Sequence, residues 1–182
     1  MIYIYLADGF EEVEALFPLD LLRRASLDVK TVSITDKNEV TGSHGITVKA
    51  DITVKSAEYD PKGAELIMLP GGMPGTKNLD ASADVHEALD YAYANGKYIA
   101  AICAAPSVIG KKGFLKDKKA TAYPGFEEYL IGRKETSERC VKDGNMITAA
   151  GAGVAMDLGL KIIETLIGKE TADKIKHAII AD

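Results

Sequence analysis

The stretch that most constrains the fold of this 182-residue chain is Tyr98–Ile109, with the sequence YIAAICAAPSVI. It predicts a buried strand, a tight turn at Cys103 and a helix that opens near Pro106. Proline is tolerated in the first turn of a helix, because the N–H groups there have no partner within the helix. A strand-to-helix turn this sharp tolerates only small neighbours, and those of the cysteine are Ala100, Ala101, Ala104 and Ala105. The stretch therefore predicts an α/β fold with a nucleophile elbow.

Cys103 has two interpretations. Unpaired N–H groups and the dipole at the start of a helix favour a negative charge, so the thiol is expected to ionise more readily than a free cysteine. Alternatively, Cys103 is a small buried hydrophobic residue without chemistry, as many single cysteines are. This segment alone leaves both readings open.

The first 34 residues predict a β–α–β unit with two parallel strands and a right-handed crossover. An apolar run at 2–6 is followed by a helical pattern over 11–24 and an alternating segment over 28–34. Pro18 predicts either a kink or a division into two short helices. The residues expected on the buried face of this helix are Val13, Leu16, Leu19 and Leu22.

The remaining patterns continue the alternation of strands and helices. In chain order, they predict a hairpin or edge strands within 35–55, a buried strand at 64–69, a helix over 84–95, a brief strand and turn at 119–125, a hairpin over 138–149 with its turn at Asp143-Gly144, and helices from 151 to about 167 and from 169 to 177. These elements predict a doubly wound, mostly parallel sheet sandwiched by helices. We expect one domain spanning residues 1–182, because repeats and linkers are absent from the sequence.

The composition of the chain limits the classes of binding partner and the cellular compartment that we expect. A net charge of −5 argues against nucleic acid or an anionic membrane surface as the main partner. No stretch approaches the roughly 20 apolar residues that span a bilayer, and the N-terminus does not read as a signal peptide. Two distant cysteines, Cys103 and Cys140, do not form a secreted disulfide framework. We therefore expect a cytoplasmic protein, and the spacing of cysteines and histidines predicts no metal site.

Four turns are expected to meet at one edge of the sheet, since ligand crevices in open parallel sheets lie beyond the carboxyl ends of the strands. These turns are Asp8–Glu14, Gly71-Gly72, Cys103 and Gly151–Gly153. Gly71-Gly72 could be only a turn, or its backbone N–H groups could face an oxyanion. The convergence predicts a functional site around Cys103.

Three carboxylates open the first helix, and Glu14 differs from the other two. For Glu11 and Glu12, interaction with the helix dipole is a sufficient explanation. Glu14 adjoins apolar residues, and a partly desolvated carboxyl beside a thiolate would keep its proton and share it with sulfur. Such a pair could transfer a proton to or from a reacting carbonyl compound. His44 is by default a surface histidine, and Cys140 is expected to be structural or merely exposed.

Four motifs in order give a resemblance that covers nearly the whole chain: DGFEEVE at 8–14, LPGGMPG at 69–75, AAICAAP at 100–106 and TAAGAG at 148–153. The chain resembles the ThiJ/PfpI superfamily, in the branch of the parkinsonism-associated protein deglycase. The resemblance implies a flavodoxin-like fold, a homodimer, a reactive Cys103 and a protonated Glu14 beside it. It also implies that Gly72 and Ala104 supply N–H groups to an oxyanion or to oxidised sulfur, and that no cofactor is needed.

Three positions depart from the patterns of the family. His44 stands where an arginine often reaches the partner subunit's site, and Tyr123 stands where the deglycase has a histidine. Both, together with Gly151, are candidates for the substrate pocket. Ala104 replaces the histidine that follows the cysteine in PfpI-type proteases, which argues against that activity.

The expected function is a cofactor-independent attack of Cys103 on a 2-oxoaldehyde such as methylglyoxal, of the glyoxalase or protein deglycase type. The substrate would be a small aldehyde or a glycated adduct. The alternative is a redox-sensing or chaperone-like stress protein whose cysteine is oxidised to sulfinate.

Overall fold

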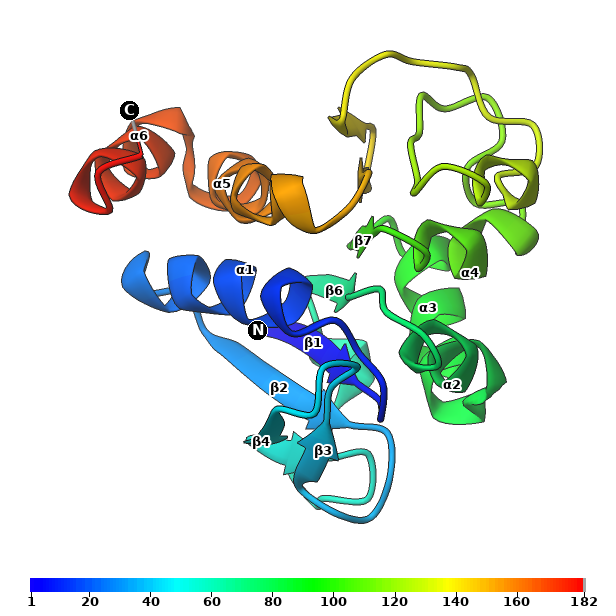
Figure 1. Ribbon diagram of the computed structural model, residues 1–182, viewed down its shortest axis with the longest axis vertical. Coiled ribbons are helices and arrows are strands. Elements are labelled where there is room, and N and C mark those ends of the chain that lie inside the picture. Colours follow the sequence, from blue (N-terminus) through cyan, green and yellow to red (C-terminus); the bar gives the residue numbers. More distant parts are fainter. Residues whose placement is uncertain (182) are drawn as a thin grey trace.

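The computed structural model (Figure 1) describes residues 1–181. It contains a seven-stranded sheet in the order β5-β2-β1-β6-β7-β9-β8. All neighbouring strands are parallel except β8, which pairs antiparallel with β9 at one edge. A separate hairpin consists of β3 and β4. The strands are β1 (Ile2–Leu6), β2 (Val29–Ser33), β3 (Glu39–Thr41), β4 (Thr47–Lys49), β5 (Ile52–Thr53), β6 (Leu66–Leu69), β7 (Tyr98–Ile102), β8 (Cys140–Asp143) and β9 (Met146–Ala149).

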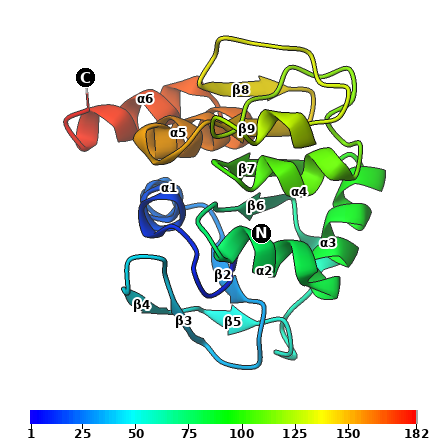
Figure 2. The ribbon, with the colours of Figure 1, turned by 45° about the vertical axis from the view of Figure 1, so that its right-hand side comes forward.

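Helices cover both faces of the sheet (Figure 2). They are α1 (Glu12–Arg24), α2 (Gly75–Ala81), α3 (Ala83–Ala94), α4 (Pro106–Lys111), α5 (Ala155–Ile167) and α6 (Lys169–Ala178), with the short 3-10 turns η1 (Pro61–Gly63), η2 (Glu127–Tyr129) and η3 (Ala152–Val154). Successive residues of a strand face opposite sides, so β1 contributes to two cores. Ile2, Ile4 and Leu6 pack with α1 and α5, whereas Tyr3 and Tyr5 belong to the core under α3 and α4. The flavodoxin-like, mostly parallel α/β sandwich predicted from the sequence is confirmed.

The predicted convergence of turns is also confirmed. β1, β6, β7 and β9 run parallel, so the segments that follow them lie at the same edge of the sheet. These segments carry the start of α1, the Gly71-Gly72 turn, Cys103 and the Gly151–Gly153 turn. Four distant parts of the chain thus meet at one place.

Several local predictions were wrong. The segment 119–125 contains no strand but only an isolated bridge from Lys119 to Lys134. The β8–β9 turn lies at Gly144-Asn145, one residue later than predicted, because Asp143 still pairs with Met146. Helix α2 was missed, because it begins at the end of the glycine- and proline-rich segment 70–75, which is typical of a loop. Val13 is 47% exposed rather than inward, because the helix turns Glu12, Ala15, Leu19 and Leu22 toward the interior instead.

Pro18 does not divide α1, which runs unbroken from Glu12 to Arg24. Proline has no N–H, so the carbonyl of Glu14 lacks its usual helical partner. Pro18 lies where α1 packs against α5: a Cβ added at Gly159 would lie 3.1 Å from the Cα of Pro18. The two helices therefore pack at backbone contact, which fixes the helix that carries Glu14.

Within residues 1–181, no helix combines the length and apolar character needed to cross a membrane.

Candidate active site

Cys103 lies at the sharp turn between β7 and α4, as the small residues around it predicted. Its backbone is left-handed, with φ at +63°, a conformation that residues other than glycine seldom adopt. The Cys103 N–H donates to the Ala149 carbonyl at 2.9 Å, and its carbonyl accepts from the Tyr123 N–H at 2.8 Å. These bonds tie the turn to β9 on one side and to the loop after α4 on the other. Such strain at a well-anchored nucleophile is characteristic of functional sites.

Glu14 reaches the cysteine from the first turn of α1. Its side chain is hydrogen-bonded to the Cys103 sulfur, and it is only 1% exposed. Its Oε2 also accepts from the Gly71 N–H at 2.9 Å. A Cβ on Gly71 would lie 2.6 Å from this oxygen and 2.7 Å from Cys103 Cβ, so only glycine fits here. The structure thus brings Glu14, Gly71 and Cys103 together.

Burial raises the pKa of Glu14 from 4.5 to about 7. The hydrogen bond with Cys103 and the backbone contacts to Gly71 and Ala152 lower it, while the charge of Glu11 raises it further. A large fraction of Glu14 therefore holds its proton at neutral pH. The expectation of a protonated glutamate beside sulfur agrees with this balance.

Burial also raises the pKa of the Cys103 thiol, to about 12, and the Glu14 carboxylate adds to the rise through its charge and hydrogen bond. The N–H groups of Ala104 and Gly72 act in the opposite direction, because they hydrogen-bond the sulfur. The expectation of an acidified thiol considered only the start of the helix and omitted desolvation. The contribution of Glu14 disappears when Glu14 carries the proton. Thiol and carboxyl therefore titrate as a coupled pair.

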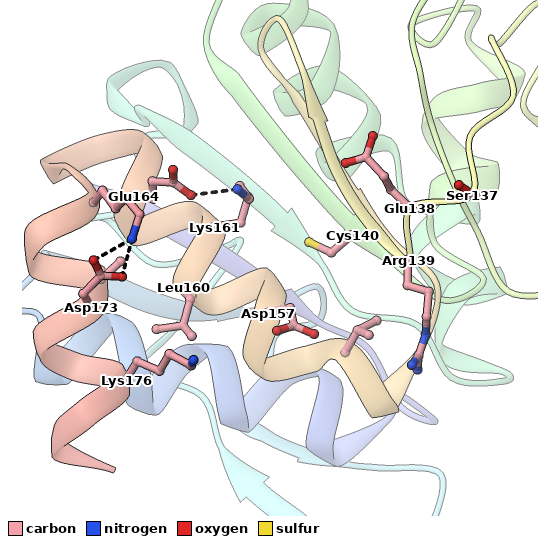
Figure 3. Close-up of a pocket in the computed structure, with 13 residues that line it drawn as sticks. Ser137, Glu138, Arg139, Cys140, Asp157, Leu160, Lys161, Glu164, Asp173 and Lys176 are labelled. Carbon is pink, nitrogen blue, oxygen red and sulfur yellow. Dashed lines mark hydrogen bonds and ion pairs between the residues drawn. The ribbon is translucent and has the colours of Figure 1, made fainter. Parts of the chain in front are cut away.

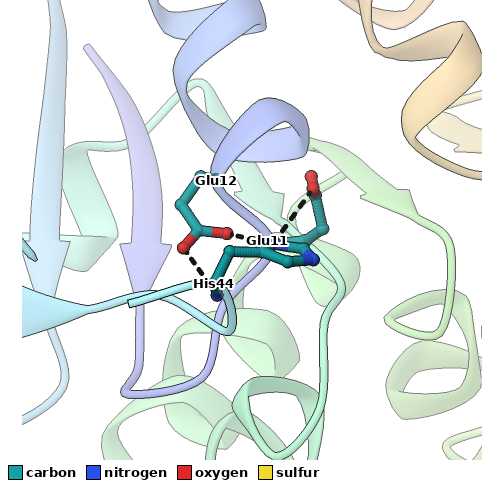
Figure 4. Close-up of side chains that lie close together, drawn as sticks. All are labelled: Glu11, Glu12 and His44. Atoms are coloured by element: carbon teal, nitrogen blue, oxygen red, sulfur yellow. Dashed lines mark hydrogen bonds and ion pairs between the residues drawn. The ribbon is translucent and has the colours of Figure 1, made fainter. Parts of the chain in front are cut away.

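His44 lies at the tip of the β3–β4 hairpin and binds Glu12 rather than Cys103 (Figure 4). Its N–H donates to Glu12 Oε1 at 2.8 Å, and its Nδ1 lies 2.7 Å from Glu12 Oε2. Burial of Glu12 opposes its ionisation, but the bonds from His44 and Ile46 outweigh burial and lower its pKa to about 2. The interpretation of Glu12 as a dipole partner alone was therefore wrong. Its partner is 32 residues away, so no local pattern could have identified it.

Glu11, Glu12 and His44 offer three ligand atoms within 4.8 Å of one another, a spacing that could hold a metal ion. A cation would have to displace the hydrogen bond between His44 Nδ1 and Glu12. Glu11 is also committed, because its Oε2 caps the helix by accepting from the Glu14 N–H at 2.7 Å. The arrangement is already satisfied as a structural link between the hairpin and α1.

Tyr123 lies beside the turn at Cys103, and Gly151 adjoins Tyr123. Tyr123 is 51% exposed, and its N–H holds the Cys103 carbonyl. A Cβ on Gly151 would lie 3.4 Å from the Tyr123 ring, so the two positions adjoin. Contact of either residue, or of His44, with a substrate stays a prediction.

Cys140 lines a different cavity, of about 620 Å³, between β8, α5 and α6 (Figure 3). Burial raises the pKa of its thiol to about 12, and the nearby Asp157 carboxylate adds to the rise. Within residues 1–181, no glutamate side chain is hydrogen-bonded to its sulfur, in contrast to Cys103. Cys140 is partly buried rather than exposed, and a structural role for it stays a prediction.

Comparisons of sequence and of structure with known proteins point to the same family. A model of the DJ-1/PfpI family matches residues 1–165. Protein dj-1beta of Drosophila melanogaster is 33% identical over 97% of this chain and 95% of its own length. A deglycase of Pyrococcus abyssi is 30% identical over 84% of this chain and 90% of its own. The structure of oxidized DJ-1 from Toxoplasma gondii has a TM-score of 0.92 and 36% identity, covering 98% of this chain and 97% of the other.

Proposed function

Because the chain belongs to the DJ-1/PfpI family, we propose that it is a cofactor-independent cysteine enzyme acting on 2-oxoaldehydes such as methylglyoxal. The observation that carries the proposal is the contact between Glu14 and Cys103. A buried carboxyl with a pKa near 7 touches a thiol that two backbone N–H groups also face. A general acid–base group is most effective when its pKa is close to the operating pH. The deglycase of Pyrococcus abyssi adds support from a relative.

The reaction begins with a proton transfer within the pair. Glu14 takes the proton of Cys103, and the thiolate attacks the aldehyde carbon to give a hemithioacetal. The N–H groups of Gly72 and Ala104 hold the oxyanion. Glu14 then gives the proton it took from the thiol to the oxygen of the hemithioacetal, and as a carboxylate it removes the proton of the former aldehyde carbon. The hydroxyl proton passes to the ketone oxygen, and Glu14 delivers the carbon-derived proton to the neighbouring carbon, which leaves a thioester of a 2-hydroxy acid and an ionised Glu14. Water hydrolyses the thioester and restores the thiol, so methylglyoxal and water become lactate.

The same attack would act on an adduct that an aldehyde has already formed with an amine or thiol. Loss of the amine or thiol from the adduct frees the modified group, which is the deglycase form of the reaction. The small-molecule or adduct substrate and a cytoplasmic location both belong to this proposal.

Lactate formation from methylglyoxal tests the proposal. Purified protein is expected to form lactate, and Cys103→Ala to abolish it, while Cys140→Ala retains it as the matched control. Lactate formation by the Cys103→Ala variant at the rate of the unchanged protein would remove the mechanism.

A second candidate function is redox sensing through Cys103. The thiolate would react with two molecules of hydrogen peroxide to give a sulfinate and two of water. The protonated Glu14 and the two backbone N–H groups could then hydrogen-bond the sulfinate oxygens. A relative of known structure, DJ-1 of Toxoplasma gondii, is described as oxidized. Mass spectrometry after mild peroxide distinguishes the cases: sulfinate confined to Cys103 supports sensing, and equal oxidation of Cys140 contradicts it.

A homodimer is part of the same proposal. Val13 and Phe17 of α1 and Ile46 at the hairpin tip are exposed apolar residues on neighbouring elements. Light scattering at several concentrations is expected to give twice the chain mass of 19.5 kDa.

A further inference from the structure

Three exposed apolar side chains gather beside the turn that carries the reactive cysteine. They are Met73, Tyr123 and Tyr129, with exposed fractions of 41%, 51% and 38%. They come from two segments that are far apart in the sequence, the loop before α2 and the loop after α4. Apolar side chains that are exposed singly are normal, but a group of them marks an interaction surface. The proposed reaction uses none of these side chains.

Two of the three adjoin the groups that surround the sulfur. The Tyr123 N–H donates to the Cys103 carbonyl at 2.8 Å, and a Cβ on Gly151 would lie 3.4 Å from the Tyr123 ring. Met73 directly follows Gly72, whose N–H is hydrogen-bonded to the sulfur. Cys103 itself is partly exposed. A molecule that reaches this sulfur therefore comes close to both exposed side chains.

The sheet places Met73 and Tyr123 on opposite sides of the cysteine. β6 and β9 pair with opposite edges of β7, and Cys103 directly follows β7. Met73 belongs to the loop after β6, whereas Tyr123 adjoins Gly151 in the turn after β9. The two side chains therefore flank the entrance to the sulfur.

Phe126 and Tyr129 connect the two sides. The Phe126 N–H donates to the Tyr123 carbonyl at 2.9 Å, and the ring centroids of Phe126 and Tyr129 lie 6.1 Å apart. Met73, Phe126 and Tyr129 line one cavity of about 110 Å³ together with residues of α2 and α4, which lie side by side in Figure 1. We call Met73, Tyr123, Phe126 and Tyr129 the apolar rim.

The charges beside the apolar rim are largely balanced. Lys111 pairs with Asp80 at 2.7 Å, and its Nζ lies 5.2 Å from the centroid of the Tyr129 ring. Among the residues that line the cavity, only Lys77 keeps a charge without a partner. Aromatic residues and methionine are enriched at the centre of protein interfaces, where charged residues are depleted. This composition favours a partner with aromatic side chains.

We propose that the apolar rim binds the polypeptide around an aldehyde-modified side chain, so that adducts with aromatic neighbours react faster at Cys103. The occupant follows from the continuity of the rim with the sulfur: whatever is attached to an adduct lies beside Cys103 while the adduct reacts. The inference rests on the proposed function and names the substrate class of the same site, which is modified peptides with aromatic neighbours rather than free methylglyoxal alone.

The test compares two acetylated and amidated tripeptides, Phe-Arg-Phe and Gly-Arg-Gly, each carrying one methylglyoxal on its arginine. One water converts each adduct into lactate and free peptide, so mass spectrometry of the free peptide measures turnover. Excess aminoguanidine captures methylglyoxal that is released spontaneously, and the rate with Cys103→Ala is subtracted as background. We expect kcat/KM to be about tenfold higher for the aromatic peptide, a difference of about 1.4 kcal/mol that the burial of one apolar side chain can supply.

Substitutions in the rim test where this preference arises. Met73→Ser and Tyr123→Ser are each expected to reduce the ratio of the two kcat/KM values, and the double variant to bring it near one. Tyr93→Ser is the matched control and is expected to keep the ratio. Tyr93 is 40% exposed but ends α3 before β7 begins, at the opposite edge of the sheet from Cys103. Thermal unfolding checks that each variant is folded.

Each outcome decides between the rim and the reaction. A ratio near one in the unchanged protein, a ratio that both rim variants leave unchanged, or turnover of methylglyoxal but of neither peptide would overturn the rim alone. Absence of turnover of methylglyoxal and of both peptides refutes the proposed function itself. Light scattering tests the other occupant: if the double variant converts a dimer into a monomer, the rim is a contact between copies of the chain and the inference is wrong.

Discussion

Glu12 and Glu14 lie two residues apart in the first turn of α1, and their carboxyl groups have opposite pKa shifts. Both side chains are buried, at 4% and 1% exposure. Nevertheless the pKa of Glu12 falls to about 2, whereas that of Glu14 rises to about 7. Burial alone therefore does not decide the protonation state of a glutamate in this helix.

The number and kind of hydrogen-bond donors account for the difference. Glu12 receives the backbone N–H groups of His44 and Ile46 and the imidazole of His44. Glu14 is desolvated by burial and faces the charge of Glu11, and its hydrogen bonds with the Cys103 sulfur and the backbone of Gly71 and Ala152 do not compensate for these effects. Environments that separate the pKa values of neighbouring carboxyls assign them different tasks. Here one carboxylate holds a hairpin, and the other is available for proton transfer.

Substitutions of Glu12 and Glu14 are expected to differ most in their effect on catalytic activity. Glu14→Gln removes the proton carrier and is expected to lower kcat/KM for methylglyoxal by about 10²- to 10⁴-fold. Glu12 touches no reacting atom, so Glu12→Gln is expected to lower kcat/KM for methylglyoxal by less than about fivefold.

The pH profile sharpens this comparison. The active form of the pair has lost one proton, so kcat/KM should rise with pH through the Glu14 pKa of about 7. Glu12→Gln should keep this rise, whereas Glu14→Gln should lose it. A rise near pH 7 that survives in Glu14→Gln would assign it to another group.

Stability should depend on pH through Glu14 in an unusual direction. The pKa of Glu14 is higher in the folded protein than in the unfolded chain, so its protonation contributes to the free energy of unfolding. This contribution is fully present below pH 4.5 and is lost as the pH rises through about 7. A rise from 4.5 to about 7 corresponds to roughly 3 kcal/mol. Urea unfolding at pH 4.5 and pH 8 should show this loss in the unchanged protein and not in Glu14→Gln. Equal pH dependence in the two proteins would mean that Glu14 is ionised at low cost.

Glu12 should contribute to stability rather than to chemistry. Glu12→Gln keeps an acceptor but loses charge assistance to the loop of residues 43–46, and we expect a loss of about 1–2 kcal/mol in the free energy of unfolding. Glu39→Gln, an exposed glutamate on β3, is the matched control and should change little. Urea unfolding at pH 7 measures both.

The sequence predicted the features that depend on local patterns. Small residues around Cys103, glycines at 71 and 72 and the alternation of strands with helices are each visible within a few positions, and together they located Cys103 and the sheet. Glu14 was singled out by its apolar neighbours and by the resemblance to the family. The Glu12–His44 contact joins residues 32 positions apart, so its prediction required the fold. Val13 looked inward because apolar spacing was counted, whereas two buried glutamates set the orientation of the helix. The rise in the Cys103 pKa depends on desolvation, which only packing reveals.

The smallest expected effect is the titration of His44 itself. Its hydrogen bond and charge interaction with Glu12 raise the pKa of the exposed imidazole above 6.5. The ion pair is therefore fully formed below pH 6.5 and is lost as pH rises through the folded value. Proton NMR of the imidazole should show that raised pKa in the unchanged protein and a return toward 6.5 in Glu12→Gln. The same spectra of Glu14→Gln should leave the His44 pKa raised, because Glu14 does not contact the imidazole. A His44 pKa that falls equally in both variants would show that the two carboxyls act as one cluster, and the division of tasks between them would be wrong.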